Sequence, residues 1–149
     1  MASLIDPVIL KLIEVWTAAL TDLDVVDGPQ VDSDPVNDRL FVGFNGDTPD
    51  EYNEGAVGVQ SLMAFAKVKG DDGQVTCAVV SRSGDSDITA TRARANGFLA
   101  AAEAALRADM SLGGLVMQAY VTDYRYSPVQ TQQGAKVRVV FTVTYKGQI

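Results

Sequence analysis

The sequence contains no histidine and only one cysteine, Cys77, among its 149 residues. A single cysteine cannot form an internal disulfide. Without histidine, the usual ligand of zinc and the usual base that activates a catalytic serine or cysteine are missing. We therefore expect a protein without catalytic residues, without a bound metal ion and without a cofactor.

Long apolar runs are also missing. The first apolar stretch is interrupted by Asp6, Lys11 and Glu14, and no basic segment precedes it. A signal peptide or a membrane span is therefore not expected, and the chain is expected to fold in a cytoplasm. Hydrophobic residues make up 47% and charged residues 21% of the sequence, as in globular proteins with a packed core. A length of 149 residues predicts one domain, covering residues 1–149.

Positive charge is scarce in one segment, and the net charge of −7 comes from that segment alone. Between positions 27 and 54, eight acids stand against one base. An acidic surface opposes the counterion release on which binding to phosphate backbones depends, so specific recognition of nucleic acid is not expected. It does not prevent DNA from passing nearby. The charged residues of the segment are Arg39 and the acids Asp27, Asp32, Asp34, Asp38, Asp47, Asp50, Glu51 and Glu54.

This acidic segment has two candidate roles, a metal site and a solvated rim. The pair Asp32 and Asp34 is followed by Pro35, which does not fit a calcium-binding loop. The acids between Asn45 and Gly55 lack the regular ligand spacing and the terminal glutamate of such a loop. The sequence therefore favours the solvated acidic rim.

Residues 4–20 are predicted to form an amphipathic helix, with Asp6 as its cap and Pro7 tolerated in its first turn. The apolar side chains span an arc of about 180°, whereas packing against one domain requires little more than about 100°. The helix therefore either packs deeply in a monomer or buries one flank against a neighbouring subunit. In the second case the candidate subunit contacts are Leu4, Val8 and Val15.

A β-hairpin is predicted from the strands 60–69 and 74–82, joined by Gly70-Asp71-Asp72-Gly73. In this register Cys77 faces Ala66 on the buried side of the sheet. Cys77 is then a small core residue with a poorly reactive thiol, because apolar surroundings disfavour the thiolate. The opposite side mixes polar and apolar residues, which is typical of a face that is partly wet or covered by a partner. It holds the further candidate subunit contacts Met63 and Phe65.

Residues 83–92, SGDSDITATR, combine carboxylates and hydroxyls before a stretch with apolar residues every three or four positions. This spacing predicts a helix from Ile88 to about Asp109, with Ser86 or Asp87 as its N-cap. A phosphate site would need a glycine-rich loop followed by lysine, and a serine nucleophile would need a base within reach. Neither pattern is present, so the segment is interpreted as a helix cap.

The last third of the chain predicts two strands after a tight bend at 112–116. Residues 119–126 carry a row of tyrosines, which indicates the half-buried face of a strand, with a stacking platform for bases or sugars as the alternative. A loop at 127–134 precedes a strand at 136–146, where alternate residues are apolar. With a further strand at 40–44, the elements predict an α+β fold. We expect a mostly antiparallel sheet with a long helix packed on one face and an N-terminal amphipathic helix.

Four short motifs follow one another along the chain. They are Val-Asp-Gly-Pro at 26–29, Leu-Phe-Val-Gly at 40–43 before an acidic Gly-Asp loop, Ser-Gly-Asp-Ser-Asp at 83–87 before an Arg- and Ala-rich helix, and Leu-Gly-Gly at 112–114 before a late alternating strand. In their order and spacing, over nearly the whole chain, they resemble the tail terminator proteins of long-tailed, siphophage-type bacteriophages. The resemblance implies a structural virion protein without catalysis.

Proteins of that family form a ring, commonly of six subunits, that caps the tail tube, ends its polymerisation and joins it to the head. The resemblance therefore implies a homo-oligomeric ring at the tail–head junction of a virion, assembled in the cytoplasm of a host bacterium. Its partners would be the major tail tube protein and the head connector protein, with DNA only passing through the channel. The candidate channel-facing acids are Asp47, Asp50, Glu51 and Glu54. The alternatives are a phage neck or head–tail joining protein and a small non-catalytic module that binds a ligand or peptide.

Overall fold

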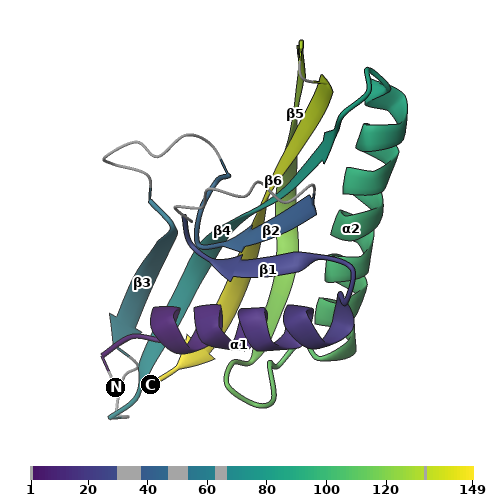
Figure 1. Ribbon diagram of the computed structural model, residues 1–149. Helices are drawn as coiled ribbons and strands as arrows, with labels where there is room; N and C mark the ends of the chain where they lie inside the picture. Colours follow the sequence, from purple (N-terminus) through teal and green to yellow (C-terminus); the bar gives the residue numbers. More distant parts are fainter. Residues whose placement is uncertain (1, 30–37, 47–53, 63–66, 133) are drawn as a thin grey trace.

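The computed structural model describes residues 2–29, 38–46, 54–62, 67–132 and 134–149 (Figure 1). These residues form one six-stranded sheet and two helices. In chain order the elements are α1 (Ile5–Ala19), β1 (Asp24–Asp27), β2 (Asp38–Val42), β3 (Ala56–Leu62), β4 (Lys69–Ser83), α2 (Ile88–Ala108), β5 (Gln118–Thr131) and β6 (Gly134–Gln148).

The sheet has the strand order β1-β2-β4-β6-β5. Strand β3 pairs with the first half of β4, and β2 pairs with the second half of β4. All pairs are antiparallel except β1 with β2, which is parallel. The α+β class is therefore confirmed, but the sheet is mixed. Strand β1 was not predicted, because its four residues, Asp24–Asp27, are too few to show a clear alternation.

Both helices contribute to a single core on one side of the sheet. Trp16 of α1 is 0% exposed, lies edge-on to Phe141 of β6 with 5.8 Å between ring centroids, and donates from Nε1 to the carbonyl oxygen of Ala102 in α2 at 3.0 Å. One side chain thus joins the two helices and the sheet. Figure 1 shows α1 lying across the strands and α2 running along the right-hand side of the molecule.

Helix α1 begins in a different way from the one predicted. Asp6 does not cap the helix. The N-cap residue is Leu4, whose side chain makes no capping hydrogen bond. Instead, Ser3 Oγ accepts from the N–H of Ile5 at 3.1 Å, and the carboxylate of Asp71 in β4 accepts from the N–H of Leu4 at 2.6 Å. A carboxylate at a helix N-terminus is favoured by the helix dipole. This acceptor is 67 positions away in sequence, so local patterns did not reveal it.

The predicted hairpin is wrong in the position of its turn. Strand β3 pairs with β4 from Ala56 opposite Val75 to Leu62 opposite Lys69, so the connection lies between residues 62 and 69. Gly70-Asp71-Asp72-Gly73 belongs to β4 itself. Glycine is required at position 73 for packing, because a Cβ on Gly73 would overlap the buried ring of Tyr145. Asp71 accepts from the N–H of Leu4 at the start of α1. Residues that are typical of a turn therefore make tertiary contacts here.

Cys77 is buried in the core as predicted, although its neighbours are different. It pairs with Val42 of β2 and Phe141 of β6 and is 0% exposed. Burial raises the pKa of the Cys77 thiol to about 12. The thiolate required for nucleophilic chemistry is therefore strongly disfavoured at neutral pH.

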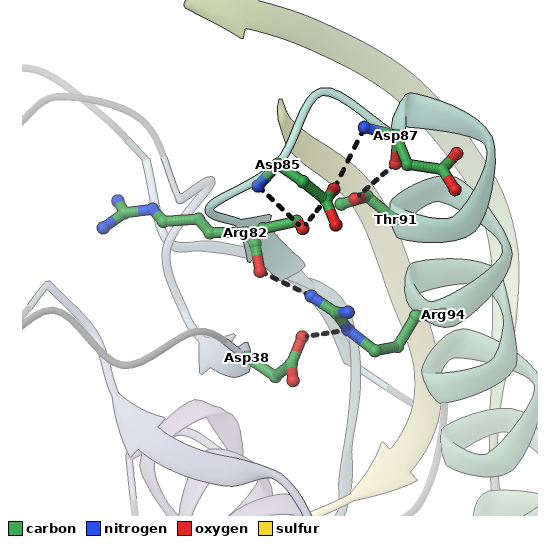
Figure 2. A network of polar contacts seen from close by, with 7 residues as sticks. Asp38, Arg82, Asp85, Asp87, Thr91 and Arg94 are labelled. Atoms are coloured by element: carbon green, nitrogen blue, oxygen red, sulfur yellow. Dashed lines mark hydrogen bonds and ion pairs between the residues drawn. The ribbon is translucent and has the colours of Figure 1, made fainter. Parts of the chain in front are cut away.

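Helix α2 begins where predicted, and Figure 2 shows the polar network around its first turn. Asp87 is the N-cap residue, and its Oδ1 accepts from the N–H of Ala90 at 3.0 Å. Asp85 Oδ1 accepts from the hydroxyl of Ser83 at 2.7 Å and from the N–H of Asp87 at 3.0 Å. These hydrogen bonds, that of Ser83 first, hold the pKa of Asp85 below its usual value. The segment 83–92 is therefore a helix cap.

Replacing Asp87 with alanine should lower the free energy of unfolding by about 1 kcal/mol, since the N–H of Ala90 loses its acceptor. Urea denaturation followed by circular dichroism measures the loss. The matched control is Ser86→Ala, because Ser86 is the neighbouring cap candidate and is exposed. Equal losses in the two variants would show that Asp87 is not the cap.

The hairpin of β5 and β6 is longer than predicted, and no loop interrupts it at 127–130, since Ser127 to Gln130 pair with β6. A β-bulge between Val121 and Asp123 changes the alternation of β5. Tyr120 lies opposite Thr144, whereas Tyr124 lies opposite Phe141, so these two tyrosines point to opposite faces of the sheet. The predicted single row of tyrosines is therefore wrong, because a sequence pattern does not show the bulge.

Candidate functional site

The acidic residues predicted to face a channel fall mostly outside the described residues. Asp47, Asp50 and Glu51 lie there, so their positions are not described. Glu54 is described and exposed, just before β3 begins at Ala56. The acidic rim thus stays a prediction. Of its four acids only Glu54 is described, and it lies at the surface next to the start of β3.

The predicted contacts on α1 are corrected by their burial. Leu4 is 2% and Val8 0% exposed, and both belong to the core of their own chain. These side chains have no surface to offer to a neighbour, so the interpretation of the wide apolar arc as an interface is wrong for both. Val15 is partly buried and packs against the same core. Met63 and Phe65 lie outside the described residues.

A buried polar pair was not predicted from the sequence. Tyr145 is 0% and Asp71 1% exposed, and among the described residues neither Tyr145 Oη nor Asp71 Oδ1 has a hydrogen-bond partner. Burial, with the nearby charges of Asp71 and Asp72, raises the pKa of Tyr145 to about 12. Both side chains are closed off from solvent, and the carboxylate of Asp71 holds the N-terminus of α1, so we assign Asp71 a structural role.

The side chains around α2 have structural partners. Arg94 reaches from α2 to Asp38 of β2, with 2.9 Å between Nε and Oδ1, and donates to the carbonyl oxygen of Arg82 in β4 (Figure 2). This ion pair fastens the helix to two strands. In the parts of the chain that the structure describes, no three aspartate, glutamate or cysteine side chains gather as metal ligands would.

Two apolar hollows flank α2. One, of about 440 Å³, lies between the end of α1 and the middle of α2 and is lined by Leu20, Phe98 and Ala101 among others. The second, of about 390 Å³, lies between the C-terminal half of α2 and the outer strand β5. It is lined by Glu103, Leu106, Arg107, Met110, Ala119, Tyr120 and Val121. The second hollow therefore sits at an edge of the sheet.

The edges of the sheet differ in how they are protected against pairing with another chain. Natural edge strands are usually short, charged, interrupted by proline, bulged or covered. Strand β1 has only four residues, with an aspartate at each end, and β5 carries a bulge together with Asp123, Arg125 and Pro128. Strand β3, Ala56-Val-Gly-Val-Gln-Ser-Leu62, has no charge and no proline.

Strand β3 is also strongly exposed. Val57, Val59 and Leu62 are 48%, 68% and 77% exposed, and within the described ranges β3 pairs with β4 alone. An exposed, uncharged and apolar edge strand is a template for another strand. We therefore regard the outer edge of β3, residues 56–62, as the candidate functional site and call it the β3 edge. This edge was not predicted, because residues 60–69 were expected to form a strand of the hairpin and no element was expected at 56–59.

Comparison with known proteins gives no identification: no family model matches the chain, and no curated protein matches it. Neither described helix has the combination of length and apolar composition needed to cross a lipid bilayer.

Proposed function

We propose that this protein is a structural virion component that assembles into a ring, caps a phage tail tube, ends its polymerisation and joins it to the head connector. The observation that carries the proposal is the β3 edge, because an exposed, uncharged and apolar edge strand is a template for a strand of another chain. The order and spacing of the four motifs along the chain support the same function. In this proposal the protein acts through contacts and carries out no catalysis.

A ring requires two different surfaces on each subunit, so that every copy contacts the next in the same way until the ring closes. In Figure 1 the β3 edge lies at the left of the molecule, while α2 lies at the right. The hollow of about 390 Å³ opens beside α2 and β5. The two surfaces are thus separated across the sheet, which suits a head-to-tail contact better than a contact between identical patches.

The acidic segment has a role in this proposal as the lining of the channel, where negative charge repels DNA phosphates and lets the genome slide. Changing Asp47, Asp50, Glu51 and Glu54 to their amides should leave assembly intact but slow the ejection of DNA. Particle yield and the rate of DNA release, measured on the same virions, test this. Normal ejection with all four changes would remove the acidic segment from the mechanism.

A second candidate function is favoured by the two hollows, which have volumes within the usual range for ligand pockets, about 300–1,000 Å³. A small non-catalytic module could bind an apolar ligand or peptide there. Such a module would exist as a monomer, and its thermal stability would rise when the ligand is added. A phage neck or head–tail joining protein is a further alternative, which shares the ring but would leave the length of the tail tube unchanged.

The experiment that separates these functions measures tube length. Purified tail tube protein of the same phage is allowed to polymerise with and without this protein, and tube lengths are measured by electron microscopy. A terminator should bind at one end of the tubes and stop their growth. Tubes that grow equally long in its presence would contradict the proposed function, and binding to the head connector without an effect on length would favour the joining protein.

A further inference from the structure

We infer that copies of this chain join through their sheets: the β3 edge of one copy pairs with the outer edge of the first part of β5, Gln118–Val121, in the next copy. One β-sheet would then continue from subunit to subunit. This inference rests on the ring proposed above and names the contact between its subunits.

The first support is that the two edges lie at the same level of the sheet. The register connects Val59 to Asp72 of β4, Asp72 to Lys146 of β6, and Lys146 to Gln118 of β5. The same holds along the next rows, which end at Gly58 and Ala119, at Val57 and Tyr120, and at Ala56 and Val121. A second copy placed beside the first, without sliding along the strands, therefore brings residues 56–59 next to residues 118–121.

The second support is the direction of the strands. Strand β3 is antiparallel to β4, β4 to β6 and β6 to β5, so β3 and β5 run in opposite directions. A neighbouring copy in the same orientation would present β3 antiparallel to β5. Antiparallel pairing is the more stable arrangement and places facing side chains on the same side of the sheet. Val59 and Gln118 would thus be neighbours across the contact.

The third support is the contrast within β5. Its bulge, Asp123, Arg125 and Pro128 all come after Val121 and protect the later part of this edge. The part from Gln118 to Val121 has none of these features. The edge of β5 is therefore open to pairing only at the level where the β3 edge arrives.

The hollow beside β5 is consistent with this contact. Ala119 and Val121 form part of its lining and lie on the face of the sheet that carries the helices. The start of α1 accompanies β3 on that same face, since Ile5 Cδ1 lies 3.4 Å from the position of a Cβ on Gly58. A neighbour that adds its β3 would thus also bring the start of its α1 toward the hollow. At the rim, Glu103 and Arg107 already form an ion pair at 2.7 Å, so closing the hollow leaves neither charge unpaired.

Disulfide formation between copies tests the contact. The full-length chain carrying both Val59→Cys and Gln118→Cys is oxidised at high concentration and separated on a non-reducing gel, and the same sample is imaged. Most of the chain should shift into a ladder of linked multimers that ends at the ring. Val59 is 68% exposed and Gln118 is half-buried on the same face of the sheet, whereas the native Cys77 is 0% exposed and does not take part.

The matched control combines Val59→Cys with Val129→Cys, because Val129 lies on the same face of β5 as Gln118 but beyond the bulge, and is 47% exposed. It should give no ladder, and neither should the single variants. Covalent dimers from Val59→Cys alone would show that β3 pairs with itself and would overturn the inference. Rings without a ladder would overturn it while leaving the proposed ring intact, and a ladder from a protein that does not stop tube growth would overturn only the proposed function.

Discussion

Replacing Trp16 with alanine should lower the free energy of unfolding by about 3–5 kcal/mol, the usual loss when a large aromatic residue is removed from a core. Trp16 is 0% exposed and contacts Phe141 edge-on at 5.8 Å between centroids. Its Nε1 also donates to Ala102 O at 3.0 Å. The loss is a large share of the about 5–15 kcal/mol that stabilises a typical domain. Urea denaturation followed by far-ultraviolet circular dichroism, which does not depend on the fluorescence of Trp16, measures this loss.

Two further variants make this result interpretable. Trp16→Phe keeps most of the packing but loses the hydrogen bond, and should lose about 1–3 kcal/mol, so it remains measurable if Trp16→Ala does not fold. The control on the same helix is Leu10→Ala, because Leu10 is 53% exposed and its removal should change stability by less than about 0.5 kcal/mol. If Trp16→Ala and Leu10→Ala had equal effects, the shared core of helices and sheet would be wrong.

Replacing Gly134 with alanine should lower the free energy of unfolding by about 3 kcal/mol, the second of the two largest losses that we expect. Gly134 has a φ of +119°, where residues with a side chain are strained by about 1–3 kcal/mol. A Cβ there would also overlap the carbonyl oxygen of Ser83 and lie 3.0 Å from that of Asp85. These are backbone atoms beside the start of α2, so they cannot rotate away. The start of β6 and the segment that caps α2 would be displaced together. Thermal unfolding of the variant measures the resulting loss of stability.

The control is Gly84→Ala in the adjoining segment. A Cβ on Gly84 would meet nothing within 4 Å, and Gly84 has no positive φ. Alanine there should leave stability unchanged or raise it by about 0.4–1 kcal/mol, because it restricts the unfolded chain. A Gly134→Ala variant as stable as Gly84→Ala would contradict the close packing between the hairpin turn and the start of α2.

Local patterns in the sequence were sufficient where the structure is determined locally. The periodicity after Ile88 and the carboxylate of Asp87 predicted α2 and its cap, and the alternation of apolar residues predicted β6, which lies between β4 and β5. Each of these signals needs only neighbouring residues. These elements can therefore be predicted without any knowledge of the tertiary fold.

The errors occurred where distant residues decide the structure. Asp71 and Gly73 are typical of a turn, yet they accept the start of α1 and make room for the ring of Tyr145. The bulge near Val121 is likewise invisible in the alternation of β5. Such positions need a partner from another part of the chain, which no window of neighbouring residues contains.

A subunit contact was expected on the N-terminal helix, whereas the structure offers the β3 edge as the candidate for it. Leu4 and Val8 were assigned to a subunit contact because the apolar arc of their helix is wide, but the core of the same chain covers both. The β3 edge became recognisable only from the pairing of the strands. Its lack of charge is visible in the sequence, whereas its position at an open edge is not.

The most direct test of the claim that this protein works by assembling with itself is its mass in solution, measured by light scattering and followed by negative-stain imaging. The account predicts one discrete multimer whose images show rings with a central hole. Val59→Lys should convert it to monomers, because a charge then stands on the β3 edge, whereas Val129→Lys should not. A monodisperse monomer that is unaffected by either change, and that gains thermal stability with a small ligand, would contradict it.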